Sequence, residues 1–215
     1  VSWQVVHDFT YPVIWLALHP VQNNIMYASV VNSVNGGIYV TSNLQAGASS
    51  TWKKLAEPTG TERHPYNVHV LNDGTLLCTY SGRRTAAGAF TASSGIFASV
   101  NGGASWTNRS DPGMLYWTKD LVIDPHDPAQ KTWYAGVFSG WGGAPNGLGG
   151  LYRTTNRGTN WSRITTGLDR VESCTVNPFT TNEAYVTTEV QGLWLSTNFH
   201  TANPTFQPLS GYPFK

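Results

Sequence analysis

The chain has 215 residues, of which 12% are charged and 13% aromatic, and its formal net charge is +1. An average globular protein carries about 25% charged residues, so this chain is poor in charge. The composition excludes intrinsic disorder, because disordered chains combine low hydrophobicity with high charge. No apolar run approaches the ~20 residues of a membrane-spanning helix, and the dispersed Lys and Arg form no basic patch for nucleic acid.

Short apolar, β-branched and aromatic runs, bounded by Gly, Pro, Asn and Asp, follow one another along the chain and predict strands. Each unit opens with an apolar run closed by a turn and continues with a β-branched run. In chain order the opening runs are residues 13–20, 67–74, 120–125 and 171–178, and the second runs are residues 25–31, 75–80, 132–138 and 184–188. No segment of comparable length has a helical period with caps. The cysteines, Cys78 and Cys174, lie in apolar stretches and are expected to be buried free thiols.

After the second run of each unit, one phrase recurs: Gly, aliphatic, aromatic, any residue, Ser or Thr, any residue, Asn. It occupies residues 37–43, 95–101, 150–156 and 192–198. The phrase runs on to a ring, which is Trp52 after a longer loop, Trp106, Trp161, and Phe206 in place of Trp. The leading glycines are about 42 to 58 residues apart, and four-stranded units of this size with one aromatic motif each are typical of β-propeller blades.

The pattern Ser/Thr-x-Asn-x-Gly-x-x-Trp resembles the Asp-box, or BNR repeat, with Asn in place of the usual Asp. The resemblance covers essentially the whole chain, and residues 123–128 and 149–153 resemble the branch that contains family 74 glycoside hydrolases (xyloglucanases) and sortilin-like proteins. In this family the box is a turn between the third and fourth strands, its acidic side chain caps backbone N–H groups, and its Trp packs between blades; Asn can close turns in the same way. The resemblance implies structural roles for Asn43 and Trp52, Asn101 and Trp106, Asn156 and Trp161, and Asn198 and Phe206.

The predicted fold is all-β, a β-propeller section of four four-stranded antiparallel blades plus one extra N-terminal outer strand. The outer strand is expected in residues 1–9, because its start resembles residues 51–55, and the blades in about residues 10–57, 58–109, 110–165 and 166–215. A self-contained four-bladed ring has no use for the extra strand, so we expect a section of a larger ring of about seven blades. Open apolar edges favour association, so remaining blades of the same protein or another copy should cover them.

In a propeller, the connections between blades and those between second and third strands share one face, opposite the box turns. We call this the loop face; loops on a rigid scaffold commonly carry binding groups. Aromatic and polar side chains together suit sugars, whose ring faces stack on aromatic rings and whose hydroxyls need directed hydrogen bonds. The expected substrate-binding residues on this face are Tyr11, Arg83, Trp117, Trp141, Arg170 and Glu189.

A glycosidase needs two carboxyl groups about 5 to 9.5 Å apart. The favoured catalytic pair is Asp120 and Glu172, because both lie near the starts of inner strands that line the central axis. Lys119 and Arg170 stand beside them in the sequence, so the competing interpretation, which the sequence favours, is an ordinary ion pair that closes the channel.

Three functions remain open. The chain is a section of a secreted hydrolase of the endo-glucanase or xyloglucanase kind, a propeller that binds glycan or protein without catalysis, or a structural piece that assembles through its edges. The expected ligand is a polysaccharide or oligosaccharide. No cofactor, metal, nucleic-acid partner or membrane span is expected, since the histidines are scattered and the Gly-rich run at residues 140–150 lacks the strand-to-helix context of a phosphate loop.

Overall fold

The computed structural model describes residues 2–82, 87, 91, 93–115, 117–139 and 147–211. Within these ranges the chain forms four four-stranded sheets and two short 3-10 helices. The first sheet holds β1 (Val13–Leu18), β2 (Met26–Val30), β3 (Gly37–Thr41) and β4 (Lys53–Lys54), and the second holds β5 (Pro65–Val70), β6 (Leu76–Tyr80), β7 (Gly95–Ser99) and β8 (Thr107–Asn108). The third holds β9 (Trp117–Ile123), β10 (Trp133–Phe138), β11 (Gly150–Thr154) and β12 (Ser162–Arg163), and the fourth holds β13 (Val171–Val176), β14 (Ala184–Thr188), β15 (Gly192–Ser196) and β16 (Gln207–Pro208). The helices are η1 (Leu44–Ser49) and η2 (Pro112–Leu115).

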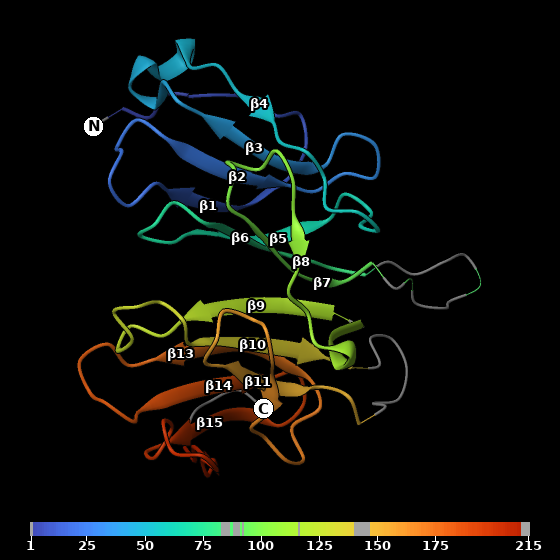
Figure 1. The fold of residues 1–215 in the computed structure, drawn as a ribbon, viewed down its shortest axis with the longest axis vertical. Coiled ribbons are helices and arrows are strands. Elements are labelled where there is room, and N and C mark those ends of the chain that lie inside the picture. The colour runs from blue at the N-terminus through green and yellow to red at the C-terminus, as the bar shows by residue number, and fades with distance from the viewer. Residues whose placement is uncertain are drawn as a thin grey trace.

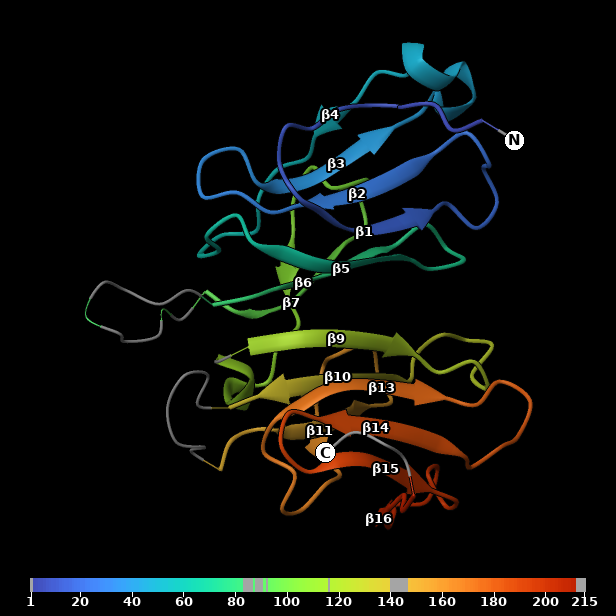
Figure 2. The ribbon, with the colours of Figure 1, turned by 180° about the vertical axis from the view of Figure 1, so that it is seen from behind.

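Every sheet is antiparallel, and its strands lie in chain order. The four sheets follow one another along the long axis of the molecule (Figure 1). Their first strands, β1, β5, β9 and β13, contact one another in succession and are seen one below the other in Figure 2. We call these the inner strands. The prediction of four antiparallel four-stranded blades is confirmed.

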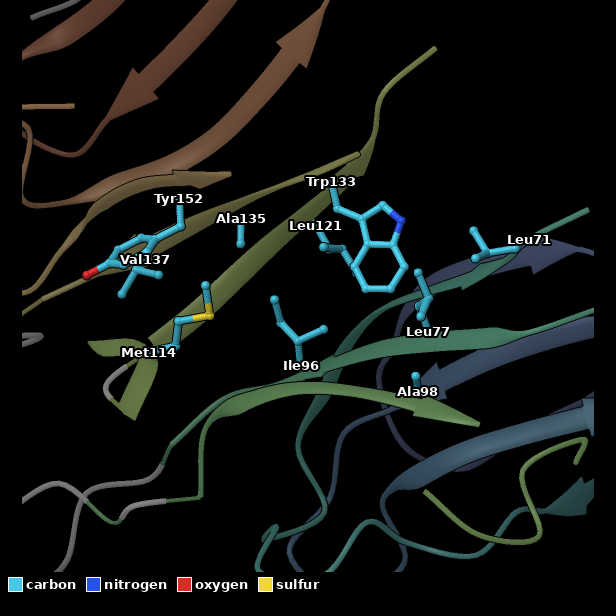
Figure 3. Packing of buried hydrophobic residues seen from close by; sticks show 10 residues of the cluster. All are labelled: Leu71, Leu77, Ile96, Ala98, Met114, Leu121, Trp133, Ala135, Val137 and Tyr152. Carbon is cyan, nitrogen blue, oxygen red and sulfur yellow. The ribbon is translucent and has the colours of Figure 1, made fainter. Parts of the chain in front are cut away.

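Apolar side chains fill the space between successive sheets. Between the second and third sheets, Ile96 and Leu77 of one sheet meet Leu121 and Trp133 of the other (Figure 3). Similar clusters lie between the first and second sheets and between the third and fourth. β6 and β10 are buried along their whole length, which explains why their sequences are mostly apolar and do not alternate with exposed polar residues. Cys78 and Cys174 are buried free thiols in these clusters, as predicted.

A hydrogen-bonded turn joins the third and fourth strands of each sheet. The Asn side-chain oxygen accepts a bond from the backbone N–H of the residue just before the ring: Thr51 to Asn43 (2.8 Å), Ser105 to Asn101 (3.0 Å), Asn160 to Asn156 (2.9 Å) and Thr205 to Asn198 (2.8 Å). The indole N–H groups of Trp106 and Trp161 donate to the carbonyls of Ala56 and Arg109, both at 2.7 Å. These carbonyls belong to the segments that leave the preceding sheets, so the turns also tie neighbouring sheets together.

Steric crowding explains why the repeated phrase begins with glycine in the second and third sheets. A Cβ on Gly150, where φ is 134°, would lie 2.7 Å from the hydroxyl oxygen of Thr165. That hydroxyl accepts the N–H of Leu151 at 2.9 Å. In the second sheet a Cβ on Gly95 would meet the Ser110 hydroxyl in the same way. The third strand therefore lies so close to the segment after the fourth strand that only glycine fits.

The N-terminal segment differs from the prediction, because described residues 2–12 form no strand. Their path is still that of an outer segment. The Ser50 hydroxyl accepts the indole N–H of Trp52 at 3.1 Å and donates to the Val6 carbonyl at 3.5 Å. Trp52 is therefore connected to the preceding segment through Ser50, whereas Trp106 bonds the preceding segment directly. An outer strand needs the third strand of its own sheet as a ladder partner, and the described chain has none there. Instead, Phe9 packs edge-on against Trp52, with ring centres 5.1 Å apart.

Candidate functional site

Each inner strand has a β-bulge near its first residue, at its loop-face end. The pairing register shifts there in all four sheets. The register shift falls at Ile14, Lys119 and Glu172, and in β5 it spans both Tyr66 and Asn67. Bulges change the direction in which a side chain points and are common next to functional sites. Ile14, Tyr66, Lys119 and Glu172 therefore occupy corresponding positions in four successive blades.

Two of these side chains form an ion pair between blades. The Lys119 ammonium contacts the Glu172 carboxylate, and the side chains remain 18% and 32% exposed. The ammonium also lies 5.1 Å from the ring centre of Phe138, which is 1% exposed. An opposite charge and an aromatic face both stabilise the cation in this position. Glu172 therefore takes part in an ion pair, which is the interpretation that the sequence favoured over catalysis.

A second ion pair lies beside the same ring. The Arg170 guanidinium is 5.4 Å from the centre of Phe138 and donates to a Glu189 oxygen at 2.5 Å. Its Nε also donates to the Ser139 carbonyl at 3.2 Å. Arg170, expected at the binding site, is thus a neighbour of Phe138, and Glu189, also expected there, is paired with Arg170. The loop ends of the third and fourth blades carry two cations and two carboxylates around one buried ring.

Tyr66 belongs to this region although the sequence reading did not select it. Burial raises the pKa of its phenol above the usual value, and the negative charge of Glu172 raises it further. The phenol is therefore protonated at neutral pH and carries an O–H donor. A signal existed in the sequence: Tyr66 directly precedes the second unit's opening run at Asn67, as Lys119 directly precedes the third unit's opening run at Asp120.

Asp120 has a different environment from its predicted partner. Its Oδ2 accepts the backbone N–H of Cys174, on the next inner strand, at 2.8 Å. Burial raises the pKa of this carboxyl, and N–H groups of Cys174 and Leu121 partly oppose the shift. Asn67 makes the corresponding contact one blade earlier, where its Oδ1 accepts the Leu121 N–H at 3.1 Å. Asp120 is therefore one of a series of links between inner strands.

The first two blades are linked at the corresponding position by another type of side chain. The indole N–H of Trp15, on β1, donates to the Val68 carbonyl of β5 at 3.0 Å. Trp15, Asn67 and Asp120 each follow a bulge, and each bonds the backbone of the next inner strand. This position needs only a side chain with a polar atom that can reach the backbone of the next inner strand. A structural role therefore accounts for Asp120 without a role in catalysis.

Of the other four expected binding residues, the structure describes Tyr11 and Trp117. Tyr11 precedes β1, and its hydroxyl accepts a bond from the Asn35 side chain at 2.9 Å, in the loop between β2 and β3 on the loop face. Trp117 is the first residue of β9. Arg83 and Trp141 lie outside the described residues.

A polar cavity of 330 Å³ lies at the turn side of the third and fourth blades. Its buried carboxylate, Asp124, accepts the Tyr134 hydroxyl at 2.8 Å and the His200 Nε2–H at 2.9 Å. The other ring nitrogen of His200 accepts the N–H of Asn182 at 3.1 Å, so both nitrogens are engaged. These contacts tie one turn to the next blade. Across the described part of the chain, no three His, Cys, Asp or Glu side chains are grouped so as to hold a metal ion.

No protein-family model matches the chain, and no curated protein matches it. It is similar to the GH74 xyloglucanase of Xanthomonas campestris, with 18% identity, a TM-score of 0.67, and coverage of 89% of this chain and 29% of that one. For the GH74 enzyme of Niastella koreensis the values are 14%, 0.64, 90% and 30%. The extracellular domain of the putative one-component system BT4673 from B. thetaiotaomicron gives 13%, 0.63, 95% and 23%.

These identities establish the fold alone. The chain has a β-propeller-like fold that resembles GH74 enzymes, as the recurring phrases predicted, and it spans less than a third of the length of these three proteins. No helix in the described ranges has the length and apolar character to cross a membrane.

Proposed function

We propose that the chain is a section of a larger, secreted propeller that binds polysaccharide through its loop face. The observation that carries the proposal is the two ion pairs, Lys119–Glu172 and Arg170–Glu189, beside the Phe138 ring at the loop ends of two successive blades. The charge of Glu172 also acts on the Tyr66 phenol of the blade before them. Together they offer a phenol, an ammonium and a carboxylate, which match the mixed donor and acceptor character of sugar hydroxyls. The structural neighbours include a xyloglucanase and an extracellular domain, which support the ligand class and the location.

The open outer face of the first sheet supports the idea of a larger ring. Leu16 and Leu18 of β1 are each 56% exposed. A groove of 360 Å³ along this face is lined almost wholly by apolar side chains, Val13 and Met26 among them. Elsewhere in the molecule, corresponding faces are covered by a neighbouring blade. We propose that a further blade covers this face in the complete ring, and that the four phrase turns are Asp-box turns.

Hydrolysis is the second candidate function. The observation in its favour is the raised pKa of the Asp120 carboxyl on the strand next to Glu172, since a general acid must hold its proton near neutral pH. Against it, one oxygen of Asp120 is engaged by the Cys174 amide. Binding without cleavage therefore accounts for more of the contacts than cleavage does.

Affinity electrophoresis of the 215-residue chain tests the proposal. The gels contain xyloglucan, hydroxyethylcellulose or polygalacturonate, and reducing-sugar release is measured on the same samples. We expect retardation by at least one neutral polysaccharide and a loss of about tenfold or more in affinity for Glu172→Gln, because a hydrogen bond to a charged group contributes about 1.5–3 kcal/mol. Unchanged mobility in all three gels, with no sugar release, would refute glycan binding by this chain. Release that disappears in Asp120→Asn would establish hydrolysis.

A further inference from the structure

We infer that a pocket on the outer part of the loop face is a second contact for the polysaccharide and holds one neutral sugar unit of it. The inference rests on the proposed function and adds a place for the ligand beyond the ion pairs of the inner strands. The pocket has a volume of 240 Å³ and lies among three connections and the outer strands β7 and β8. Its lining includes Thr59, Ser93, Phe97, Asn108 and Asp111.

The topology places this pocket on the loop face. Thr59 lies in the connection between the first and second blades, Ser93 in the one between β6 and β7, and Asp111 in the one between the second and third blades. Connections of both these kinds belong to the loop face. Phe97 and Asn108 pair in register, so their side chains share one face of the second sheet. Phe97 belongs to the cluster between the first and second sheets, so this face is turned toward the first sheet.

Hydrogen bonds hold the walls of the pocket together. The Ser93 hydroxyl donates to the Glu62 carboxylate at 2.7 Å, which joins the β6–β7 loop to the connection that carries Thr59. The Ser110 hydroxyl, also in the lining, accepts the Ile96 N–H at 2.8 Å, which joins the third connection to β7. A site whose walls are fixed before the ligand arrives loses less conformational entropy when it binds.

The lining has the chemistry of a sugar contact. The Oδ1 atoms of Asn108 and Asp111 accept the N–H groups of Ser110 and Gly113, both at 2.8 Å. These bonds fix the two side chains and do not use the amide NH₂ of Asn108 or the second oxygen of Asp111. An amide donor and a carboxylate acceptor can serve hydroxyls, each of which can donate and accept. The ring of Phe97 adds an apolar wall for the carbon face of a sugar.

Charge and size define the ligand unit further. The described lining residues include the carboxylate of Asp111 and no Lys, Arg or His. An acidic sugar would therefore meet a like charge without a compensating cation, which is unfavourable. The volume is below the roughly 300–1,000 Å³ of sites for drug-sized ligands, so the pocket suits a single neutral sugar unit. We expect xyloglucan oligosaccharides to bind and galacturonate oligosaccharides to bind much more weakly.

The pocket is connected to the ion pairs of the inner strands. Ser94, which lines the pocket, accepts the backbone N–H of Thr118 with its hydroxyl oxygen at 2.8 Å. Thr118 directly precedes Lys119, whose ammonium pairs with Glu172. Both places lie on the loop face, so one polysaccharide chain can contact the ion pairs and place one of its units in the pocket.

The test compares Asp111→Asn with the parent chain by isothermal titration with xyloglucan oligosaccharides. The variant keeps Oδ1 as the acceptor of the Gly113 N–H and replaces the second carboxylate oxygen by an amide NH₂. A hydrogen bond to a charged group is stronger than a neutral one, so the affinity should fall by about 5- to 10-fold. Asn108→Asp keeps the acceptor of the Ser110 N–H, removes both amide donors and should also weaken binding.

The matched control is Asp8→Asn. Asp8 lies outside the pocket, and its Oδ1 accepts the N–H of Thr10, two residues further on, at 2.7 Å, as Asp111 does with Gly113. This substitution should leave the affinity unchanged. Circular dichroism and thermal unfolding verify that all three variants are folded.

The outcomes separate the inference from the proposed function. If the parent chain binds while Asp111→Asn and Asn108→Asp bind equally well, the inference is wrong and glycan binding stands. If the parent chain binds no oligosaccharide, glycan binding fails and the assignment of the pocket fails with it. A loss of affinity in Asp8→Asn as large as in Asp111→Asn, or equally tight binding of galacturonate oligosaccharides, would also refute a neutral sugar in this pocket.

Discussion

Replacement of Asp120 by Asn and by Ala distinguishes a structural link from a catalytic acid. Asn67 already makes the same kind of contact one blade earlier, with its side-chain oxygen 3.1 Å from the Leu121 nitrogen. Asp120→Asn should therefore keep an acceptor for the Cys174 N–H and change the free energy of unfolding by less than about 1 kcal/mol at neutral pH. Asp120→Ala leaves that amide without its partner.

The expected cost of Asp120→Ala follows from the amide that loses its acceptor. A buried polar group without a partner costs about 1–3 kcal/mol, and for a chain of this size each kcal/mol lowers the melting temperature by about 2–4 °C. Urea unfolding and differential scanning calorimetry measure both quantities. Asn67→Ala, which removes the corresponding acceptor from the Leu121 N–H, is the matched control and should have a similar cost.

The pH dependence supplies an independent check on Asp120. Its folded-state pKa is raised by burial, so between the unfolded value of about 4 and the raised value the folded state binds more protons than the unfolded state. This carboxyl therefore stabilises the fold less as the pH rises through that window, and Asp120→Asn lacks the effect. The stability of the Asn variant relative to the parent should improve from pH 4 toward pH 7.

Two results would refute this reasoning about Asp120. Equal destabilisation by Asn and Ala would mean that the charge, and not the acceptor, matters at this position. The second result is a parent chain that releases reducing sugar and a folded Asp120→Asn variant that releases none. Asp120 would then be catalytic, and its likeness to Trp15 and Asn67 as a link between inner strands would be coincidental.

The remaining predictions concern the turns and their links. Asn101→Ala should destabilise the chain by about 0.5–2 kcal/mol in urea, as the loss of a capping side chain does, while Asn101→Asp should be nearly neutral. Trp161→Phe should cost at least the roughly 0.5–1.5 kcal/mol of its indole hydrogen bond. The Arg157 guanidinium lowers the pKa of Asp73 to about 2, so this pair's stabilisation is present above about pH 4 and is lost as the pH falls toward 2. Because both side chains are more than a third exposed, the effect in acid titrations should be small, and Arg157→Ala should abolish it.

Local features of the fold were readable from the sequence because they depend on neighbouring residues. The turn around Asn156 closes through bonds to Thr154 and Asn160, at most four residues away. The glycine at the start of each third strand is also a constant residue of the phrase. Four copies of such a local signature fixed the number of sheets and the order of their strands.

The contacts of the candidate site depend on residues far apart in the chain. Asp120 meets Cys174 across 54 positions and Lys119 meets Glu172 across 53. No periodicity distinguishes the residue at each register shift from the residue that follows it, because a bulge breaks the alternation that sequence reasoning relies on. Tyr66 was missed for this reason. The N-terminal strand was expected from its likeness to residues 51–55, but a strand also needs a partner, which sequence similarity cannot supply.

The bulge explains how one scaffold can carry different chemistry in each blade. It commits one residue to the backbone of the next inner strand, so that position must provide a polar atom, as Trp15, Asn67 and Asp120 do. The residue before it lies at the register shift, outside the regular ladder of its sheet. Its identity can therefore change from blade to blade, from Ile14 to Glu172, without loss of the fold. The Lys119–Glu172 ion pair shows that charged side chains at this position can also join neighbouring blades.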